Sequence, residues 1–277
     1  FFDTMKLLGK PNFGVLYKVE NLILKAISTY KLSTAQLNLW MIDRAYWQKK
    51  LAEEAEKSGV KIWENAPIEP EDLAKLKKDY DFIIDASGAP SVTSRLYGFT
   101  KFYKDQSGKT VQCTVEGDFS HISNSLKVGL MPDFWGYYWI FPKTKKVANV
   151  GVGNFNPNEK DRLWERLDRV LMKENLNGYK IRNKTGGICP TAIVDKLVFD
   201  NILLVGDAAG LTSPLHGGGI DMAIISAKEA VNSIASDWSK YDKTLRAVFD
   251  KKLKFEKLLV KIWRQRNLDE MDKLIGN

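Results

Sequence analysis

Residues 201–220 read NILLVGDAAGLTSPLHGGGI, and this stretch decides the fold. The apolar run 201–205 is typical of a fully buried strand, and Gly206-Asp207 follows it at once. A proline and three consecutive glycines then precede a segment with helical spacing. Glycines there let the backbone approach a bulky ligand, and the amino terminus of a helix offers unpaired N–H groups. We therefore predict a ligand-binding strand, turn and helix, in which Asp207 accepts hydrogen bonds from sugar-like hydroxyls.

The segments on either side of this unit have two different textures. Residues 41–60 predict a helix, which leads into a short strand over 60–63, and YDFIIDASG at 80–88 predicts a buried strand that runs into a tight turn. From 95 to 190, short alternating segments are broken by Gly, Pro and Asn, which favours a mostly antiparallel sheet. Helical spacing of leucines over 161–174 predicts one helix within that region.

The composition is that of a folded globular protein. The chain has 277 residues, of which 44% are hydrophobic and 27% are charged. Cys113 and Cys189 are far apart and lack metal-ligand spacing, so we expect neither a disulfide framework nor a metal site. Because the sequence shows no apolar run of membrane-spanning length and no signal peptide, we expect a cytoplasmic protein.

Basic residues gather near the carboxyl terminus. The net charge is +8, and residues 240–277 hold eleven Lys or Arg against six Asp or Glu. No zinc-finger, RRM or KH signature accompanies them, so we expect phospholipid headgroups rather than nucleic acid as the anionic partner. Apolar residues recur here at three- and four-residue intervals and predict a basic amphipathic helix, which either meets an anionic membrane surface or packs on the protein. They are Phe255, Leu258, Leu259, Ile262 and Trp263.

The deciding stretch resembles the second FAD-binding motif of flavoproteins built like p-hydroxybenzoate hydroxylase. The matching residues are Gly206-Asp207-Ala208-Ala209-Gly210, then Pro214 and Gly217-Gly218-Gly219 at the start of a helix. The resemblance implies that Asp207 binds the ribityl chain of FAD and that the glycine-rich turn faces the isoalloxazine. It implies cofactor contacts from Gly206, Asp207, Ala208, Pro214, Gly217, Gly218 and Gly219.

Two further segments are similar to the same superfamily. Asp43-Arg44 and the helix after it look like a segment whose arginine lies near the cofactor, which implies a cofactor-binding role for Arg44. The turn Asp85-Ala86-Ser87-Gly88 resembles one that closes on FAD, so Gly88 joins the predicted cofactor residues. The order and separation of the three segments agree with the superfamily.

The subfamily is indicated by residues 137–142, which read YYWIFP. This resembles the Tyr-x-Trp-x-Phe-Pro motif of geranylgeranyl reductases, which lines their substrate cavity. The resemblance implies substrate contacts from Tyr137, Trp139, Phe141 and Pro142. The three aromatic residues alternate, so on a strand they share one face and form an apolar wall.

The sequence departs from that family in two places. The amino-terminal G-x-G-x-x-G unit that grips the AMP half of FAD is absent, and we expect that the sequence is incomplete rather than degenerate. Near Lys10–Gly14, where family members show a cysteine beside the flavin, Asn12 or Phe13 takes its place. His216, inside the glycine-rich turn, is then the candidate proton donor.

These observations predict an α/β flavoprotein with a p-hydroxybenzoate hydroxylase-like fold that lacks its first βαβ unit. Residues 1–95 and 185–238 would form the FAD-binding domain, 96–184 an inserted antiparallel substrate-binding sheet, and 239–277 basic carboxyl-terminal helices. The resemblance implies an FAD-dependent reductase that saturates carbon–carbon double bonds of geranylgeranyl chains in membrane lipid biosynthesis, with electrons from NAD(P)H or reduced ferredoxin. The alternatives are a monooxygenase or halogenase of the same fold, and a non-catalytic binding protein.

Overall fold

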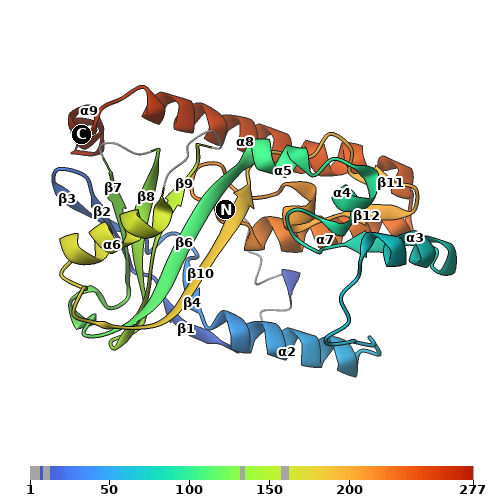
Figure 1. Ribbon diagram of the computed structural model, residues 1–277, viewed down its shortest axis with the longest axis horizontal. Helices are drawn as coiled ribbons and strands as arrows, with labels where there is room; N and C mark the ends of the chain where they lie inside the picture. Colours follow the sequence, from blue (N-terminus) through green and yellow to red (C-terminus); the bar gives the residue numbers. More distant parts are fainter. Residues whose placement is uncertain (1–6, 9–12, 132–134, 157–161, 277) are drawn as a thin grey trace.

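The computed structural model describes residues 7–8, 13–131, 135–156 and 162–276 (Figure 1). A large sheet lies at one end of the molecule, and a small sheet with several helices lies at the other. The long helix α8 (Tyr241–Arg264) runs along one side of both parts. The predicted mixed α/β class is confirmed.

The large sheet has seven strands. In spatial order they are β10 (Lys180–Pro190), β6 (Ser107–Glu116), β9 (Val147–Asn154), β8 (Gly136–Thr144), β7 (Ser125–Leu130), β2 (Asn21–Lys25) and β3 (Thr29–Ser33). Neighbouring strands are antiparallel except β2 and β7, which are parallel. The predicted antiparallel sheet is confirmed. It also takes up residues 21–33, which we had assigned to the flavin domain, and the domain division itself stays a prediction.

The two faces of this sheet have different roles. Tyr138 and Ile140 point to the face covered by α6 (Leu163–Lys173), where they join the buried core of the sheet. Because side chains alternate along a strand, Tyr137 and Trp139 lie on the opposite face. That face is turned away from α6, and Trp139 on it is itself buried.

The small sheet brings two strand-end turns together. Its strands are β11 (Val198–Phe199), β12 (Ile202–Leu204) and β5 (Ile83–Asp85), and β12 pairs in parallel with β5. Leu204 is opposite Asp85, and the N–H of Val205 donates to the Asp85 carbonyl at 3.1 Å. Since parallel strands end at one edge of a sheet, the turns that follow Asp85 and Val205 lie side by side, as the fold class requires.

The remaining elements surround this sheet or link it to the large one. The helices are α2 (Arg44–Lys57), α3 (Pro70–Asp79), α4 (Val92–Tyr97), α5 (Lys101–Gln106), α7 (Ile220–Ala235) and α9 (Leu268–Gly276), with 3-10 turns η1 (Ser120–Ile122), η2 (Gly206–Ala209) and η3 (Trp238–Lys240). Strands β1 (Val15–Lys18) and β4 (Trp40–Ile42) form a separate antiparallel pair. The predicted helices over 41–60 and 161–174, and the one predicted after the three consecutive glycines, are confirmed.

One local prediction is wrong, and one helix lies where the sequence analysis predicted no element. Residues 60–63 form no strand, and the side chains of Val60, Ile62 and Trp63 are exposed without a pairing partner. The acidic, proline-containing segment before β5 is a helix, α3, because Glu69 and Asp72 form a capping box around Pro70 at the first helical position.

Helix α8 does not bury the apolar stripe that was predicted from the sequence. The residues that face the protein are Tyr241, Leu245, Phe249, Leu253, Glu256 and Val260. Phe255, Leu258 and Ile262 keep 60%, 53% and 38% of their surface exposed. The prediction of a single apolar stripe is therefore wrong, since α8 has a buried face and a second apolar face in solvent. Among the described helices, none is both long enough and apolar enough to cross a bilayer.

Candidate functional site: a glycine-rich turn beside an aromatic row

The turn after β12 is held rigidly from three sides. The N–H of Gly206 donates to Ser226 Oγ on α7 at 3.0 Å, and the buried Tyr103 hydroxyl donates to the carbonyl of Ala208 at 2.5 Å. Gly210 has φ +81°, and a Cβ there would lie 1.8 Å from the carbonyl oxygen of Ala192. Only glycine fits this position, so the turn presents the neighbouring Asp207 in one orientation.

Asp207 lies where the sequence placed it, among other predicted cofactor residues. Burial raises the pKa of the Asp207 carboxyl, and the positive charge of Arg44 opposes that rise. A Cβ on Gly219 would lie 3.3 Å from Asp207 Oδ1, so the glycine-rich turn comes right up to the carboxylate. Within residues 13–131, 135–156 and 162–276, no protein donor hydrogen-bonds this carboxylate. A half-buried acceptor without a protein partner fits a ligand that carries hydroxyl groups.

The glycine-rich turn leads directly into α7. The N–H of Ser213 donates to the Gly218 carbonyl at 2.9 Å, the N–H of Gly217 donates to the Ser213 carbonyl at 2.8 Å, and Gly217 has φ +66°. Gly219 is the N-cap and offers no side chain, so the first N–H groups of α7 remain available to a ligand. Gly219 thus lies beside Asp207, and Pro214, Gly217 and Gly218 belong to the same turn, whereas the contact of all four with a cofactor stays a prediction.

A buried carboxylate that the sequence did not single out supports this turn. Glu256 on α8 accepts a hydrogen bond from Ser213 Oγ at 2.6 Å, and Ser213 Oγ accepts the N–H groups of Leu215 and His216 at 3.2 Å. Lys252 Nζ lies 3.6 Å from the other carboxylate oxygen. In the sequence, Glu256 is a charged residue within an otherwise apolar helical stripe. This pattern can be recognised only once the buried face of α8 is known.

We expect Glu256→Ala to lower the free energy of unfolding by about 1.5–3 kcal/mol, because it leaves the Ser213 hydroxyl and the Lys252 ammonium without their shared partner. Thermal and urea unfolding measure the change. Glu54→Ala is the matched control, since Glu54 forms only an exposed ion pair with Lys57 and its removal should change stability by less than about 0.5 kcal/mol. Equal, small effects of the two variants would show that the turn does not depend on Glu256.

Two groups near the turn could carry a proton. His216 Nδ1 accepts the N–H of Gly218 at 3.1 Å, which puts the proton of a neutral ring on Nε2. Burial lowers the pKa of His216, so the ring is neutral at pH 7 and its role as a proton donor stays a prediction. Cys189 lies on the other side, with its Sγ 3.7 Å from where a Cβ of Gly217 would be. Burial raises the pKa of this thiol to about 11, so it keeps its proton at neutral pH.

The turn after β5 is built around Asp85. Its carboxylate accepts the N–H groups of Ser87 and Thr93, both at 2.9 Å, and so closes the turn onto the start of α4. Asp85 is thereby occupied with its own backbone. Gly88 has φ +85° and open space around its Cα, so its predicted contact with a cofactor is sterically allowed and remains a prediction.

The aromatic residues of β8 form a continuous row on the face turned away from α6. The rings of Tyr137 and Trp139 are 5.9 Å apart, those of Trp139 and Phe141 are 6.2 Å apart, and Phe155 stacks on Tyr137 at 5.8 Å. A Cβ on Gly151 would lie 2.2 Å from the indole of Trp139, so the neighbouring strand must carry glycine here. The predicted shared face of the three motif aromatics is confirmed.

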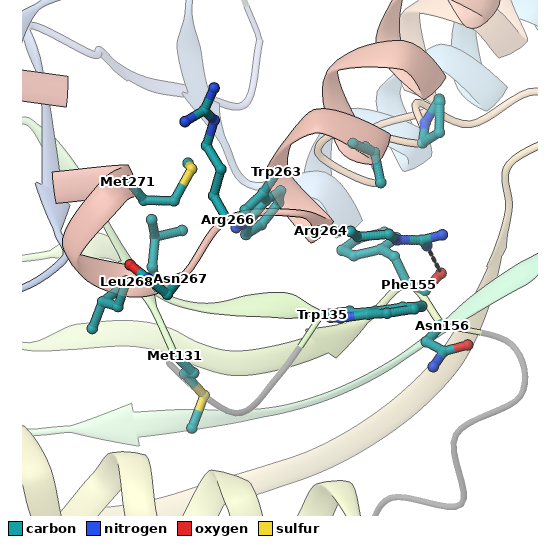
Figure 2. Close-up of a pocket in the computed structure, with 13 residues that line it drawn as sticks. Met131, Trp135, Phe155, Asn156, Trp263, Arg264, Arg266, Asn267, Leu268 and Met271 are labelled. Carbon is teal, nitrogen blue, oxygen red and sulfur yellow. Dashed lines mark hydrogen bonds between the residues drawn. The ribbon is translucent and has the colours of Figure 1, made fainter. Parts of the chain in front are cut away.

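Both ends of this row meet other parts of the site. The Tyr137 hydroxyl donates to the carbonyl of His216 at 2.6 Å and so ties the row to the glycine-rich turn. At the far end of the motif, the carbonyl of buried Pro142 accepts a hydrogen bond from the Tyr17 hydroxyl. Next to Phe155 a cavity of about 440 Å³ opens between the sheet and the end of α8 (Figure 2). The row therefore connects the turn with a cavity.

Comparison with known proteins gives a consistent picture. The geranylgeranyl reductase catalytic domain family matches residues 110–188, which include the aromatic motif. A digeranylgeranylglycerophospholipid reductase of Thermoplasma volcanium is 30% identical over 254 residues, covering 77% of this chain and 61% of that protein. The reductase of the same name from Methanosarcina acetivorans is 28% identical, and the match covers 84% of this chain and 60% of that protein. The chain thus spans about three fifths of the length of these relatives.

Solved structures share the fold. A geranylgeranyl bacteriochlorophyll reductase-like protein of Thermoplasma acidophilum superimposes with a TM-score of 0.80 at 21% identity, covering 99% of this chain and 79% of that one. A flavin-dependent brominase has a TM-score of 0.63 at 14% identity, covering 98% and 80%. The predicted resemblance is therefore confirmed: the chain is similar to digeranylgeranylglycerophospholipid reductases, residues 110–188 match the geranylgeranyl reductase catalytic domain, and the fold is p-hydroxybenzoate hydroxylase-like.

Proposed function

We propose that the protein is an FAD-dependent reductase that saturates carbon–carbon double bonds of isoprenoid lipid chains. The observation that carries this proposal is the 2.6 Å hydrogen bond between the Tyr137 hydroxyl and the His216 carbonyl, because it joins an aromatic wall to the glycine-rich turn. A long apolar substrate held against that wall would lie beside whatever the turn binds. The relatives named as lipid reductases support the same substrate class.

The residues present fit the flavin part of the cofactor. Asp207 offers a carboxylate without a protein partner to ribityl hydroxyls, and Arg44 supplies a nearby positive charge. The turn from Pro214 to Gly219 brings backbone close to the carboxylate, since a Cβ on Gly219 would lie 3.3 Å from Asp207 Oδ1. When bound, FAD would supply the hydride that adds to one alkene carbon.

The chain's own groups would position the substrate and supply the second hydrogen. An isolated double bond accepts hydride poorly, so a proton must be delivered from a well-placed donor. Cys189, protonated at neutral pH, and the Nε2–H of His216 both border the turn. Tyr137, Trp139 and Phe141 would hold the chain by burying its methylene groups at about 0.8 kcal/mol each, which needs no polar recognition.

Flavin retention tests the cofactor proposal. The purified protein is incubated with FAD, freed of excess cofactor and examined by visible absorption. The expected result is a bound, yellow flavin, and a colourless protein would argue for the non-catalytic binding alternative. Consumption of oxygen together with substrate would instead indicate a monooxygenase or halogenase. Reduction by NAD(P)H or by reduced ferredoxin identifies the electron donor.

We also propose that the outward face of α8 contacts a membrane surface. Phe255, Leu258 and Ile262 form an exposed apolar face, and the lysines Lys251, Lys254 and Lys261 are exposed beside it. A lysine near an anionic bilayer contributes about 1 kcal/mol of attraction. A peripheral contact of this kind would let a lipid substrate pass from the bilayer to the enzyme.

We expect the protein to sediment with vesicles that contain anionic lipid and to be released as the salt concentration rises. The double variant Phe255→Ser/Leu258→Ser should bind several-fold more weakly, because it removes the apolar part of the face. Met172→Ser is the control, since Met172 is exposed on α6, away from this face. Failure to sediment at low salt, or equal binding to neutral vesicles, would contradict a basic membrane-contact face.

A further inference from the structure

The aromatic row contacts the backbone of the glycine-rich turn at two successive residues. The Tyr137 hydroxyl donates to the carbonyl of His216 at 2.6 Å. One residue later, a Cβ on Gly217 would lie 3.2 Å from the ring of Phe155, which stacks on Tyr137. Burial raises the pKa of Tyr137, so its hydroxyl keeps its proton and remains a donor. The row therefore supports the turn directly.

Phe155 is itself fixed through both of its backbone groups. Its N–H donates to the Trp135 carbonyl at 2.9 Å, and its carbonyl accepts Nη2 of Arg264 at 2.8 Å (Figure 2). The side chain is buried, and a Cβ on Gly108 would lie only 2.7 Å from its ring. Because the ring is closely packed, it is a firm surface against which Tyr137 and the turn can rest.

The turn depends on such outside contacts. Residues 217–219 are three consecutive glycines, which lose more backbone freedom on folding than other residues do. The N–H of His216 donates to Ser213 Oγ at 3.2 Å, and its carbonyl accepts the bond from Tyr137. The backbone of His216 is thus held at both of its polar groups. A segment that is ordered in advance binds a ligand at a lower entropic cost.

We propose that the Tyr137 hydroxyl is a positioning group for the glycine-rich turn, and that it couples ligand binding on the aromatic row to ligand binding at the turn. A ligand on the row would pack against the Tyr137 ring and keep the hydroxyl on the His216 carbonyl, so that the turn is ordered before its own ligand arrives. Because the single hydroxyl proton is engaged with this carbonyl, Tyr137 acts through the turn and not as a proton donor to substrate.

The coupling must be reciprocal. If occupation of the row strengthens binding at the turn by some factor, occupation of the turn strengthens binding on the row by the same factor. The identities of the two ligands, an isoprenoid chain and a flavin, rest on the proposed function. The positioning of the turn does not, since it follows from contacts within the chain.

The positioning role can be tested without any ligand by Tyr137→Phe, which keeps the ring and removes only the hydroxyl. The chain has two histidines, and the His216 ring belongs to the turn because its Nδ1 accepts the N–H of Gly218. We expect Tyr137→Phe to shift the imidazole NMR signals of His216 and to leave those of His121, on η1, unchanged. Amide hydrogen exchange at Gly217 and Gly218 should become about threefold to tenfold faster, as expected for one lost neutral hydrogen bond.

Tyr30→Phe is the matched control, because it also removes a hydroxyl that donates to a backbone carbonyl, that of Asp272 at 2.9 Å. Tyr30 lies on β3, at the edge of the large sheet opposite β10. The control should leave the His216 signals and the exchange at the turn unchanged, whereas Phe155→Leu should change both. Unchanged His216 signals in Tyr137→Phe, or an equal shift in Tyr30→Phe, would overturn the positioning role.

The coupling is measured by equilibrium binding, with oxidised FAD and farnesol as the probes, so that no turnover takes place. We expect saturating farnesol to strengthen FAD binding to the parent protein by at least about threefold, and FAD to strengthen farnesol binding by the same factor. In Tyr137→Phe the factor should fall to about one, although the ring remains, and Tyr30→Phe should keep the parent value. Equal factors in the parent and in Tyr137→Phe would overturn the coupling.

Failure of this inference and failure of the proposed function give different results. A parent protein that binds neither probe, but whose His216 signals shift in Tyr137→Phe, would overturn the proposed function and the coupling and leave the positioning of the turn. A parent protein that binds FAD and reduces isoprenoids, with Tyr137→Phe identical to it in NMR, hydrogen exchange and binding, would overturn the inference and leave the reductase.

Discussion

Trp139→Ala is expected to lower kcat/KM for isoprenoid substrates by roughly tenfold to a hundredfold while the protein keeps its flavin. Trp139 is the middle ring of the aromatic row, between Tyr137 and Phe141, and its indole is accommodated only because Gly151 has no side chain. Burying a large apolar side chain against a ligand contributes about 1.5–3 kcal/mol, which corresponds to that loss in transition-state binding. Steady-state kinetics and the flavin absorption of the same sample measure both quantities.

Ile140→Ala is the matched control, because Ile140 is the next residue of β8 and points to the opposite face, into the core against α6. It should lower stability by about 2–5 kcal/mol and leave kcat/KM of the folded protein nearly unchanged. If Trp139→Ala and Ile140→Ala both lose stability, flavin and activity in parallel, Trp139 is a core residue and the proposed contact of the aromatic row with substrate is wrong.

Asp207→Ala is expected to weaken flavin binding by about tenfold to a hundredfold. The carboxylate has no protein hydrogen-bond donor in the described structure, and the loss of charge-assisted bonds to ligand hydroxyls costs about 1.5–3 kcal/mol. The dissociation constant from flavin fluorescence measures the effect. Asp79→Ala, at the exposed carboxyl end of α3, should bind flavin normally.

The stability of the cofactor-free Asp207 variant distinguishes ligand loss from unfolding. Burial raises the pKa of Asp207, so folding favours its protonated form, and that favourable contribution is lost as the pH rises through the folded pKa. At neutral pH the buried charge therefore destabilises the empty protein. Asp207→Ala should be at least as stable as the parent without flavin. Unchanged flavin affinity would remove Asp207 from the cofactor site.

The sequence predicted those elements whose signals are local. The apolar run of β12, the glycine-rich turn and the helical spacing of α7 all lie within one short stretch. The alternation in β8 was enough to place Tyr137, Trp139 and Phe141 on one face. The approach of Arg44 to Asp207 came from the resemblance alone, because nothing local connects residues so far apart.

Most of the features that the sequence did not predict depend on contacts between residues that are far apart in the sequence. The segment 60–63 has no strand to pair with. No element was predicted for the segment that forms α3, although Glu69 and Asp72 form a capping box at its start. The parallel pairing of β2 with β7 joins segments about a hundred residues apart, which no local pattern reveals. Helix α8 has two apolar stripes, and the sequence does not show which of them is buried. The structure shows that the buried stripe is the one that contains Glu256.

Parts of the site were missed for the same reason. Cys189 was considered only for disulfide or metal chemistry, and its position beside Gly217 follows from the path of β10 along the sheet. Arg264 was counted among the basic residues of an amphipathic helix, whereas the structure turns it toward Trp135 and Phe155. The segment Lys10–Asn12, where the family cysteine is replaced, lies outside the described residues.

In the proposed function, the protein transfers electrons from bound flavin to an isoprenoid double bond. The most direct test is to reduce the flavin-loaded protein chemically without oxygen, add a geranylgeranyl lipid, and follow flavin absorption together with the mass of the lipid. We expect that the flavin becomes oxidised and that the lipid gains two hydrogens for each flavin oxidised, and that Trp139→Ala slows both changes. A flavin that stays reduced with the lipid unchanged, while it is readily oxidised by oxygen, would contradict it.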